Sequence, residues 1–284
     1  MKSTGVIDLR PRLLCPICRE KLQWFATTAN CTHCGEEYPI VDGIYDMRPK
    51  AISRQPLFYS HPLWKTFING LVNIHEHYYG SSAAKLEARF KRALFKLTQG
   101  NVGEVVDIGC GTGSGFEFLG SDENIIGLDI DMALLRRCRS KHPNATLVCC
   151  DFTRSPFLSA SFETIFSVGS LEHMFFLDSA LENMQIMLSR TGSAYVLIPT
   201  EGGLAWSLAR HLFTRSKNAR ILGMTVSQFD EVMQISHCNT VFAIDSAIRK
   251  FFRVDAYRDW PIGVGGAHAN LVRCYRLTSL LATG

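Results

Sequence analysis

The chain has 284 residues, about twice the usual size of one domain, so it is long enough to bury a large hydrophobic core. Hydrophobic residues make up 46% and charged residues 20%, which excludes a disordered or low-complexity chain. The net charge of +4 is too small to indicate a nucleic-acid partner without a basic patch. No stretch approaches the roughly 18 apolar residues of a membrane span, and the first residues carry no apolar export signal, so we expect a cytoplasmic protein.

The first 48 residues carry two Cys-x-x-Cys pairs and little helical periodicity. Cys15 and Cys18 form the first pair, Cys31 and Cys34 form the second, and twelve residues separate the pairs. Each pair turns the chain tightly enough to aim two thiolates at one ion, and four thiolates close a tetrahedral site with no position for water or substrate. The pattern predicts a zinc ribbon over 1–48, in which a structural Zn²⁺ contributes folding free energy. The alternatives are a redox dithiol pair or a ribbon that has lost its metal.

A linker and a helical stretch are predicted next. Residues 49–63 are assigned to a linker, because the stretch KAISRQPLFYSHP within them contains prolines at positions 56 and 62 and no sustained pattern. From Trp64 to about Leu97 the apolar residues recur at spacings of three and four, as they do in amphipathic helices. We assign residues 64–284 to one large domain that begins with these helices.

From Gly103 onward, short apolar runs alternate with helical patterns. The runs are VVDIG, IIGLDI, ATLVCC, TIFSV and AYVLIP, and segments such as MALLRRCRSK and SALENMQIMLSR separate them. This alternation is typical of an α/β fold, because the strands of a parallel sheet are buried on both faces by helices. Two further runs, RVDAYRDW and ANLVRCYRL, flank the glycine-rich turn PIGVGGAH, which predicts an antiparallel final pair.

The first strand of this core leads into the glycine-rich sequence GCGTGSG. Gly109, Gly111 and Gly113 let the backbone turn sharply and approach a ligand closely. The dinucleotide pattern G-x-G-x-x-G fails, because positions 114 and 116 are not glycine, and this disfavours NAD. S-adenosylmethionine carries cationic sulfonium and ammonium groups, so the carboxylate of Asp107 beside the loop favours that cofactor.

Acidic residues follow the next two strands. Asp129 comes 22 residues after Asp107, at the end of a strand, where a carboxylate accepts the hydroxyl protons of a ribose. Asp131 is the competing candidate, or it caps the next helix. Asp151 follows the third strand and is expected to accept a hydrogen bond from the adenine amino group, with Phe152 supplying a backbone or stacking contact. The alternative for Asp151 is an ordinary turn residue.

With these residues, the chain resembles the class I S-adenosylmethionine-dependent methyltransferases of the type 11 group over about residues 103–280. The resemblance implies a Rossmann-like, seven-stranded, mostly parallel sheet with an antiparallel last strand. It assigns the loop glycines and the acids described above to cofactor binding, and it adds Ser167 from the strand-four segment. It also implies a cofactor contact from Tyr79, in a helix that closes over the site; simple packing is the alternative.

The N-terminal ribbon has its own resemblance, over about 35 residues. It resembles the zinc-ribbon proteins that activate tRNA and protein methyltransferases, and the N-terminal ribbon of large-subunit rRNA guanine methyltransferases. The latter commonly use a histidine where this chain has a cysteine, and that departure weakens an rRNA assignment.

Three residues are candidates for contact with the methyl acceptor. His173, after strand four, is a candidate general base or substrate ligand, or it orients its helix. Glu201, after strand five, is a candidate for holding a polar substrate group, and Arg215 in a basic run for binding an anionic one. A solvated loop and a solvated helix face are the alternatives for the last two.

The sequence also bears on the kind of acceptor. Enzymes that methylate exocyclic base amines carry Asn/Asp-Pro-Pro-Tyr where this chain has Val-Gly-Ser-Leu, which disfavours that reaction. We therefore expect an S-adenosylmethionine-dependent methyltransferase for a small-molecule, sugar-linked or lipid-linked metabolite, with oxygen as the first expectation for the acceptor atom. One alternative is an rRNA or tRNA methyltransferase whose ribbon grips the RNA, with steeply salt-dependent binding. The other is a cofactor-binding scaffold without turnover.

Overall fold

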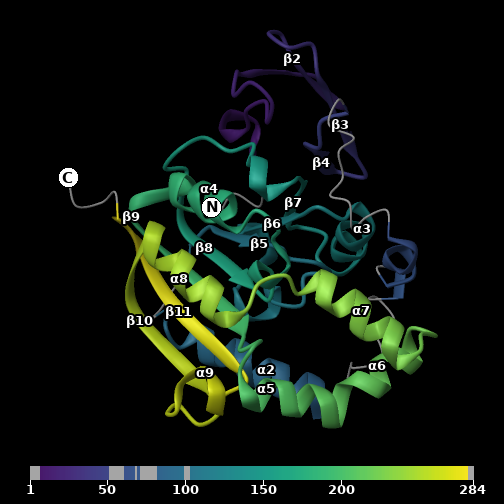
Figure 1. Ribbon diagram of the computed structural model, residues 1–284. Coiled ribbons are helices and arrows are strands. Elements are labelled where there is room, and N and C mark those ends of the chain that lie inside the picture. Colours follow the sequence, from purple (N-terminus) through teal and green to yellow (C-terminus); the bar gives the residue numbers. More distant parts are fainter. Residues whose placement is uncertain (1–6, 51–60, 68, 71–81, 99–102, 281–284) are drawn as a thin grey trace.

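The computed structural model describes residues 7–50, 61–67, 69–70, 82–98 and 103–280 (Figure 1). Its strands are β1 (Leu22–Trp24), β2 (Thr28–Cys31), β3 (Glu37–Val41), β4 (Ile44–Asp46), β5 (Val105–Ile108), β6 (Ile125–Asp129), β7 (Thr146–Cys149), β8 (Phe162–Val168), β9 (Leu188–Pro199), β10 (Phe252–Trp260) and β11 (Val272–Ser279). The α-helices are α2 (Ser82–Phe95), α3 (Met132–Lys141), α4 (Leu177–Met187), α5 (Leu204–Ala209), α6 (Arg215–Ile221), α7 (Val226–Ser236), α8 (Val241–Phe251) and α9 (Gly266–Ala269). Shorter helical turns are η1 (Arg10–Arg12), η3 (Phe116–Phe118), η4 (Asp122–Asn124), η5 (Phe152–Arg154), η6 (Leu171–His173) and the π-helical η7 (Arg210–Thr214), and residues 62–67 and 69–70 are also helical.

The five apolar runs after Gly103 form the parallel strands β5 to β9, as the alternating pattern predicts. The parallel strands are hydrogen-bonded in the order β7-β6-β5-β8-β9. Beyond them, β11 runs antiparallel between β9 and β10, which confirms the predicted final pair. Among the parallel strands, the chain begins at β5, runs outward through β6 to β7, and then crosses to β8 and β9 on the other side. The strand order reverses at β5, and ligands of such sheets bind outside the carboxyl ends of the strands at this point.

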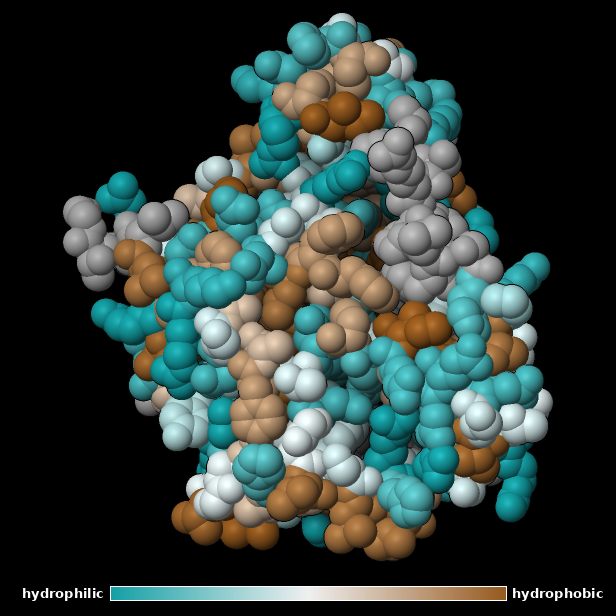
Figure 2. All heavy atoms as spheres, viewed as in Figure 1, coloured by the Kyte–Doolittle hydropathy of each residue, from teal (hydrophilic) through white to brown (hydrophobic). Residues whose placement is uncertain are grey.

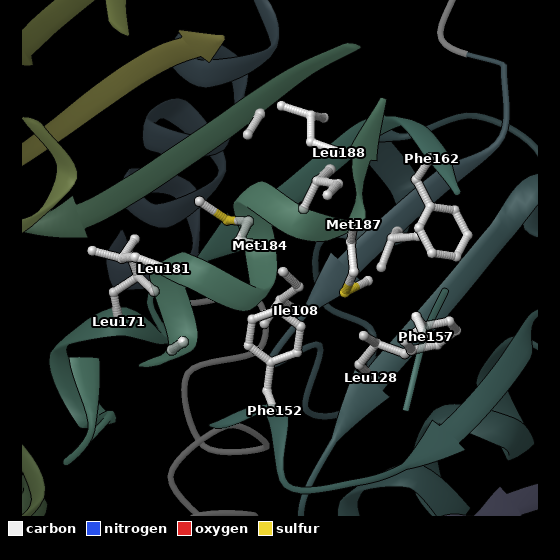
Figure 3. Packing of buried hydrophobic residues seen from close by; sticks show 14 of the residues in the cluster. Ile108, Leu128, Phe152, Phe157, Phe162, Leu171, Leu181, Met184, Met187 and Leu188 are labelled. Atoms are coloured by element: carbon white, nitrogen blue, oxygen red, sulfur yellow. The ribbon is translucent and has the colours of Figure 1, made fainter. Parts of the chain in front are cut away.

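Helices cover both faces of the parallel strands. Successive strand residues point to opposite sides, so neighbouring residues of one strand pack in different clusters. Val105 packs in one cluster with Leu94 of α2 and Leu135 of α3. Its neighbour Val106 packs on the other face, in a cluster with Leu181 of α4 and residues of α8. Figure 3 shows α4 lying over this second cluster, with methionine and leucine side chains pointing toward the sheet.

The sheet has 11 strands rather than the expected seven, because the N-terminal ribbon continues it. The last ribbon strand, β4, pairs in parallel with β7, and Ile44 lies opposite Leu147. β3 and β4 form a hairpin whose two turn residues, Asp42 and Gly43, both have positive φ angles (54° and 73°). Such a turn matches the twist of the two strands, so the short sequence Asp-Gly fixes this hairpin. The ribbon therefore forms one edge of the sheet (Figure 1).

The ribbon also shares the hydrophobic core of the parallel strands. Leu13, Tyr38 and Met47 are buried in the same cluster as Val148 of β7. The guanidinium of Arg19 donates hydrogen bonds to the backbone carbonyls of residues 155 and 157, which lie between β7 and β8. The ribbon thus has continuous backbone pairing and continuous apolar packing with the rest of the molecule.

Residues 204–236, from α5 to α7, form a helical segment between β9 and α8 that we call the arm (Figure 1). Its α6 and α7 pack in a separate cluster, in which Phe229 and Val232 meet Trp64 and Phe67. The helical character predicted from Trp64 is therefore confirmed where the chain is described. No helix in the described part of the chain has the length and hydropathy that crossing a bilayer requires.

Candidate active site and metal centre

The three predicted loop glycines all adopt backbone conformations that favour glycine, with φ angles of 73°, 55° and 77° at Gly109, Gly111 and Gly113. A Cβ on Gly109 would lie 2.4 Å from the Cβ of Ser170, and one on Gly113 would lie 2.7 Å from a ring carbon of His142. A Cβ on Gly111 would meet nothing within 4 Å. The loop therefore packs tightly at its two outer glycines and leaves open space at the middle one, where a ligand can approach the backbone.

Asp107 lies at the end of β5, beneath this loop, and is only 3% exposed. Burial raises the pKa of its carboxyl to about 7; the charge of Lys91 acts against this rise and the charge of Asp129 adds to it. One carboxylate oxygen of Asp107 is buried without a hydrogen-bond partner among the described residues. Leaving such an oxygen unpaired costs about 1–3 kcal/mol. A cationic ligand group above the loop would remove that cost, so this residue fits S-adenosylmethionine.

Asp129 ends β6 and points back toward the loop. Its two carboxylate oxygens accept hydrogen bonds from the backbone N–H groups of Gly111 and Asp131, each at 2.9 Å. Burial raises the pKa of Asp129 to about 6, and the backbone hydrogen bonds act against the rise. Asp131 instead caps α3 by accepting from the N–H of Ala133 at 2.7 Å. Of the two acids, Asp129 is therefore the one beside the loop, and the geometry is suited to a ribose.

The two residues expected at the adenine have local structural partners. Asp151 caps η5, accepting from the backbone N–H of Thr153 at 3.0 Å and from its hydroxyl at 2.6 Å. The ring of Phe152 lies in the hydrophobic core with the α4 residues (Figure 3), and its carbonyl accepts from Asn183 at 3.0 Å. The capping contacts of Asp151 are those of a turn residue, which was the alternative for this position. The ring of Phe152 is buried, so little of its surface is available to stack on an adenine.

Ser167 and Tyr79 complete the predicted cofactor residues. Ser167 is fully buried, and its hydroxyl lies 2.6 Å from that of Ser170, which donates to the carbonyl of Ile108 at 3.0 Å. Ser167 thus ties β8 to the base of the cofactor loop. Tyr79 lies outside the described residues.

Lys91 was missed by sequence reasoning. It comes from α2 and is buried, and its ammonium group donates to the hydroxyl and carbonyl of Ser114 in the loop, at 2.8 Å and 3.0 Å. Its only signal in the sequence is its position three residues before Leu94, on the buried side of an amphipathic helix. Lys91 fixes the far end of the loop and reduces the pKa rise at Asp107.

Two of the three candidate residues for contact with the methyl acceptor lie where β8 and β9 end. His173, in η6, lies against His237, with ring centroids 4.6 Å apart. Glu201 contacts the ring of His237 and accepts from the indole N–H of Trp206 at 3.2 Å. Arg215 lies elsewhere, in the arm, where it is paired with Asp230. The structure therefore brings His173 and Glu201 together through His237, a residue that no sequence motif indicated.

The four predicted cysteine ligands converge in the ribbon. Their sulfur atoms all lie within 4.8 Å of one another, and none forms a disulfide. The sulfurs of Cys15 and Cys34 are 3.5 Å apart, and those of Cys18 and Cys31 are 3.4 Å apart. Thiolates at a Zn–S distance of about 2.3 Å around a tetrahedral ion would be about 3.8 Å apart, so the cluster has close to the size that Zn²⁺ requires.

The two Cys-x-x-Cys pairs adopt the same turn. The residues that follow them, Arg19 and Gly35, have φ angles of 66° and 76°. Their N–H groups each donate at 2.9 Å, to the carbonyls of Cys15 and Cys31 respectively. The hydroxyl of Tyr38 lies 3.2 Å from the sulfur of Cys15, where it can donate to a thiolate. These turns aim both pairs at one centre, and the donor set fits a closed, structural zinc site.

Comparisons with known proteins agree with this fold. The family model for a methyltransferase domain matches residues 105–192. A SAM-dependent methyltransferase of Thermotoga maritima has a TM-score of 0.51 and 15% identity, over 76% of this chain and 99% of that one. A protein of Pyrococcus horikoshii OT3 has a TM-score of 0.50 and 16% identity, over 72% and 98% of the two chains. An uncharacterised protein of Methanocaldococcus jannaschii is 32% identical over 100 residues, which are 35% of this chain and 42% of that protein.

The fold is the Rossmann-like α/β fold of class I methyltransferases. The matched domain contains β5 to β8, the glycine loop and both acids at its carboxyl edge. Residues 105–192 therefore correspond to a methyltransferase domain.

Proposed function

We propose that the protein transfers a methyl group from S-adenosylmethionine to an oxygen of a small-molecule metabolite that carries an apolar or lipid-linked part. The cofactor would lie over Gly111, with its cationic groups toward Asp107 and its ribose toward Asp129. S-adenosylmethionine supplies a methyl group activated by a positively charged sulfur, so the protein has to bind, orient and desolvate the reactants rather than activate the methyl donor.

The observation that carries the substrate class is the exposed apolar face of the arm. Leu204, Leu208 and Leu212 recur every fourth residue and are 72%, 60% and 61% exposed. Phe213 is 72% exposed. This face starts directly after β9, three residues beyond Glu201, so it borders the candidate acceptor residues. Contiguous exposed apolar side chains beside a site are typical of a surface that meets an apolar ligand or a membrane.

Neighbouring residues enlarge this face. Ile262 and Val264, in the turn before α9, are 62% and 71% exposed, and α9 packs against the start of α5. Figure 2 shows hydrophobic residues gathered along the lower edge of the molecule, where Figure 1 places α5 and α9. The arm also contains the π-helical turn η7, a conformation that is frequent at functional sites.

The basic run of the arm does not favour RNA. Arg215 is paired with Asp230, and Arg210 lies 3.3 Å from Glu201 and 3.6 Å from Asp230. Paired guanidinium groups contribute little to the release of counterions on which RNA binding depends. The ribbon, which an RNA methyltransferase would use to grip its substrate, is attached along the sheet edge instead. We propose that its four cysteines hold a structural Zn²⁺.

The test is transfer of radiolabelled methyl from S-adenosylmethionine by the purified, zinc-loaded protein into a host extract separated into RNA, protein, lipid and polar pools. We expect label in the lipid pool or in an amphiphilic fraction of the polar pool, and much less label with Asp107→Asn at the same, sub-saturating concentration of S-adenosylmethionine. Label in RNA that disappears steeply with salt would establish the RNA alternative. An absence of label in every pool, with cofactor binding intact in calorimetry, would support the scaffold alternative.

A further inference from the structure

Two histidines lie together beside the cofactor loop, at the carboxyl edge of the sheet. The ring of His237 meets that of His173 edge to face, at an angle of 88° and a centroid distance of 4.6 Å. His173 is three residues beyond Ser170, which packs against Gly109 and bonds to the carbonyl of Ile108. The pair is therefore connected by direct packing to the loop that holds the methyl donor.

His237 is held by a carboxylate through one ring nitrogen. Its Nδ1 forms a short hydrogen bond with Glu201. Glu201 is fixed in turn by Trp206, which donates at 3.2 Å, and by Arg210, which donates at 3.3 Å. Burial raises the pKa of Glu201, but hydrogen bonding and charge from His237 and the charge of Arg210 outweigh this and lower it overall. An ionised carboxylate can only accept, so Nδ1 carries a proton; in the neutral form of the ring, the lone pair is therefore on Nε2.

His173 is held in a different way. Its Nδ1 lies 2.9 Å from the backbone carbonyl of Ser236, so this nitrogen also carries the proton. The carboxyl nearest to its other nitrogen, 4.0 Å away, belongs to Glu172. Burial raises the pKa of Glu172 to about 7; the charge of His237 acts against this rise and that of Glu201 adds to it. A carboxyl that is about half protonated near neutral pH stabilises an imidazolium less well than an ionised one, such as Glu201 beside His237.

We propose that His237 is the general base for methyl transfer to a hydroxyl acceptor, with Glu201 as its positioning residue. This inference rests on the proposed function and names its acceptor group, an alcohol or a phenol. The hydroxyl oxygen attacks the methyl carbon, the carbon–sulfur bond breaks, and its electron pair stays on sulfur as the neutral thioether of S-adenosylhomocysteine. The hydroxyl proton passes to Nε2 of His237, and the resulting imidazolium is stabilised by Glu201.

The position of His237 suits this role. Its side chain is 13% exposed, so it is reachable but largely shielded from water. The structure gives its Nε2 no hydrogen-bond partner among the described residues. The groups that face or surround His237 are Glu201, Glu172, His173, Cys238 and, through Glu201, Arg210. None of these contacts uses the nitrogen that would take the proton.

The first experiment compares turnover of the wild type, His237→Gln and Glu201→Gln, with the lipid pool of a host extract and saturating S-adenosylmethionine. We expect kcat to fall about 10²–10⁴-fold in His237→Gln, with the affinity for S-adenosylmethionine unchanged. The acidic limb of the kcat–pH profile should disappear in that variant and remain in Glu172→Gln. Glu182→Gln, a change of the same kind as Glu201→Gln at an exposed residue of α4, should match the wild type.

The second experiment needs no acceptor. Nitrogen NMR of the histidine-labelled protein should find His237 as the Nδ1–H tautomer, and Glu201→Gln should shift it toward the other tautomer. An Nε2–H tautomer in the wild type, or a His237→Gln variant with wild-type kcat and pH profile, would overturn the inference. If the wild type itself transfers no methyl while the tautomer is as expected, the proposed function fails, and a scaffold with a preserved histidine pair remains.

Discussion

The ribbon and the arm are both additions to the parallel core, but they are attached in different ways. The ribbon continues the sheet through β4 and β7 and buries Tyr38 and Met47 in the main core. The arm has its own small apolar cluster around Phe229 and leaves Leu204 and Leu208 exposed. A segment that shares backbone hydrogen bonds and core with the sheet is suited to stability, whereas one with an exposed apolar face beside the site is suited to recognition. Four experiments test this contrast, from the largest expected effect to the smallest.

Loss of a zinc ligand should have the largest effect. In Cys15→Ser, or after chelation, we expect the Tm of the whole protein to fall by about 10 °C or more, because structural zinc contributes folding free energy and the ribbon shares the main core. Scanning calorimetry should detect one cooperative transition. Cys238→Ser, which changes an exposed cysteine outside the ribbon, is the control. If the ribbon instead melted in a transition of its own, and the transition of the remaining protein and its cofactor binding were unchanged, the ribbon would be an independent module.

Cofactor affinity should depend on Asp107 and on pH. We expect Asp107→Asn to raise the Kd for S-adenosylmethionine about 10–100-fold, since one cationic contact is lost. The pKa of Asp107 is raised to about 7, so below that pH the carboxyl must lose a proton before it pairs with a cation. Affinity should therefore be constant above pH 7 and weaken up to about tenfold per unit below it.

Titration calorimetry between pH 5.5 and about 8 checks this dependence. In Asp107→Asn the loss of affinity should begin only near pH 6, where Asp129 becomes protonated. Asp178→Asn, at an exposed ion pair with Lys250, should bind as the wild type does. An unchanged pH profile in Asp107→Asn would contradict the assignment of this residue to the cationic part of the cofactor.

The contact of the ribbon with the core can be tested at Arg19. Because its φ angle is 66°, Arg19→Gly keeps a favourable backbone and removes only the side chain that bonds two core carbonyls. We expect the free energy of unfolding to fall by about 1–3 kcal/mol in denaturant titration. Arg10→Ala, at an exposed site, should change it by less than about 0.5 kcal/mol. Equal stability of the two variants would mean that Arg19 does not hold the ribbon.

The smallest effect on stability is expected in the arm. Leu208→Gln combined with Leu212→Gln should change the free energy of unfolding by less than about 0.5 kcal/mol, because both side chains are exposed. The same variant should transfer several-fold less label into the lipid pool, with unchanged affinity for S-adenosylmethionine. Unchanged transfer would contradict a role of the arm in substrate recognition. A large loss of stability would mean that these leucines support the fold instead. Leu280→Gln, at an exposed leucine at the far end of β11, is the matched control.

Much of the fold was predictable because it depends on local patterns. Helix α3 coincides with the segment MALLRRCRSK, β5 to β7 lie within the first three apolar runs, and β8 and β9 contain the last two. The loop glycines were predictable because only glycine tolerates their positive φ angles next to Ser170 and His142. The cysteine pairs were predictable because two residues between ligands suit one tight turn.

The rest depended on contacts between distant residues. No sequence period indicates that β4 pairs with β7, because a three-residue strand carries too little pattern to specify a neighbour more than 100 positions away. His237 and Lys91 lie in helical or loop segments without a motif, and their roles arise from Glu201 and Ser114 on other elements. The sequence predicts a ligand contact for Asp151, and the structure adds that one of its carboxylate oxygens caps a helical turn.

By itself, the sequence determined the α/β core, the glycine loop with its two acids and the four-cysteine cluster, because each rests on residue types at short, fixed spacings. Only the tertiary structure decided that the ribbon extends the sheet to 11 strands and that Glu201 is hydrogen-bonded to His237. Burial decided the protonation of Asp107 and Glu172, since the pKa of a carboxyl depends on how much water the fold removes from it. Such long-range pairing and desolvation are properties of the packed chain, which no local pattern contains.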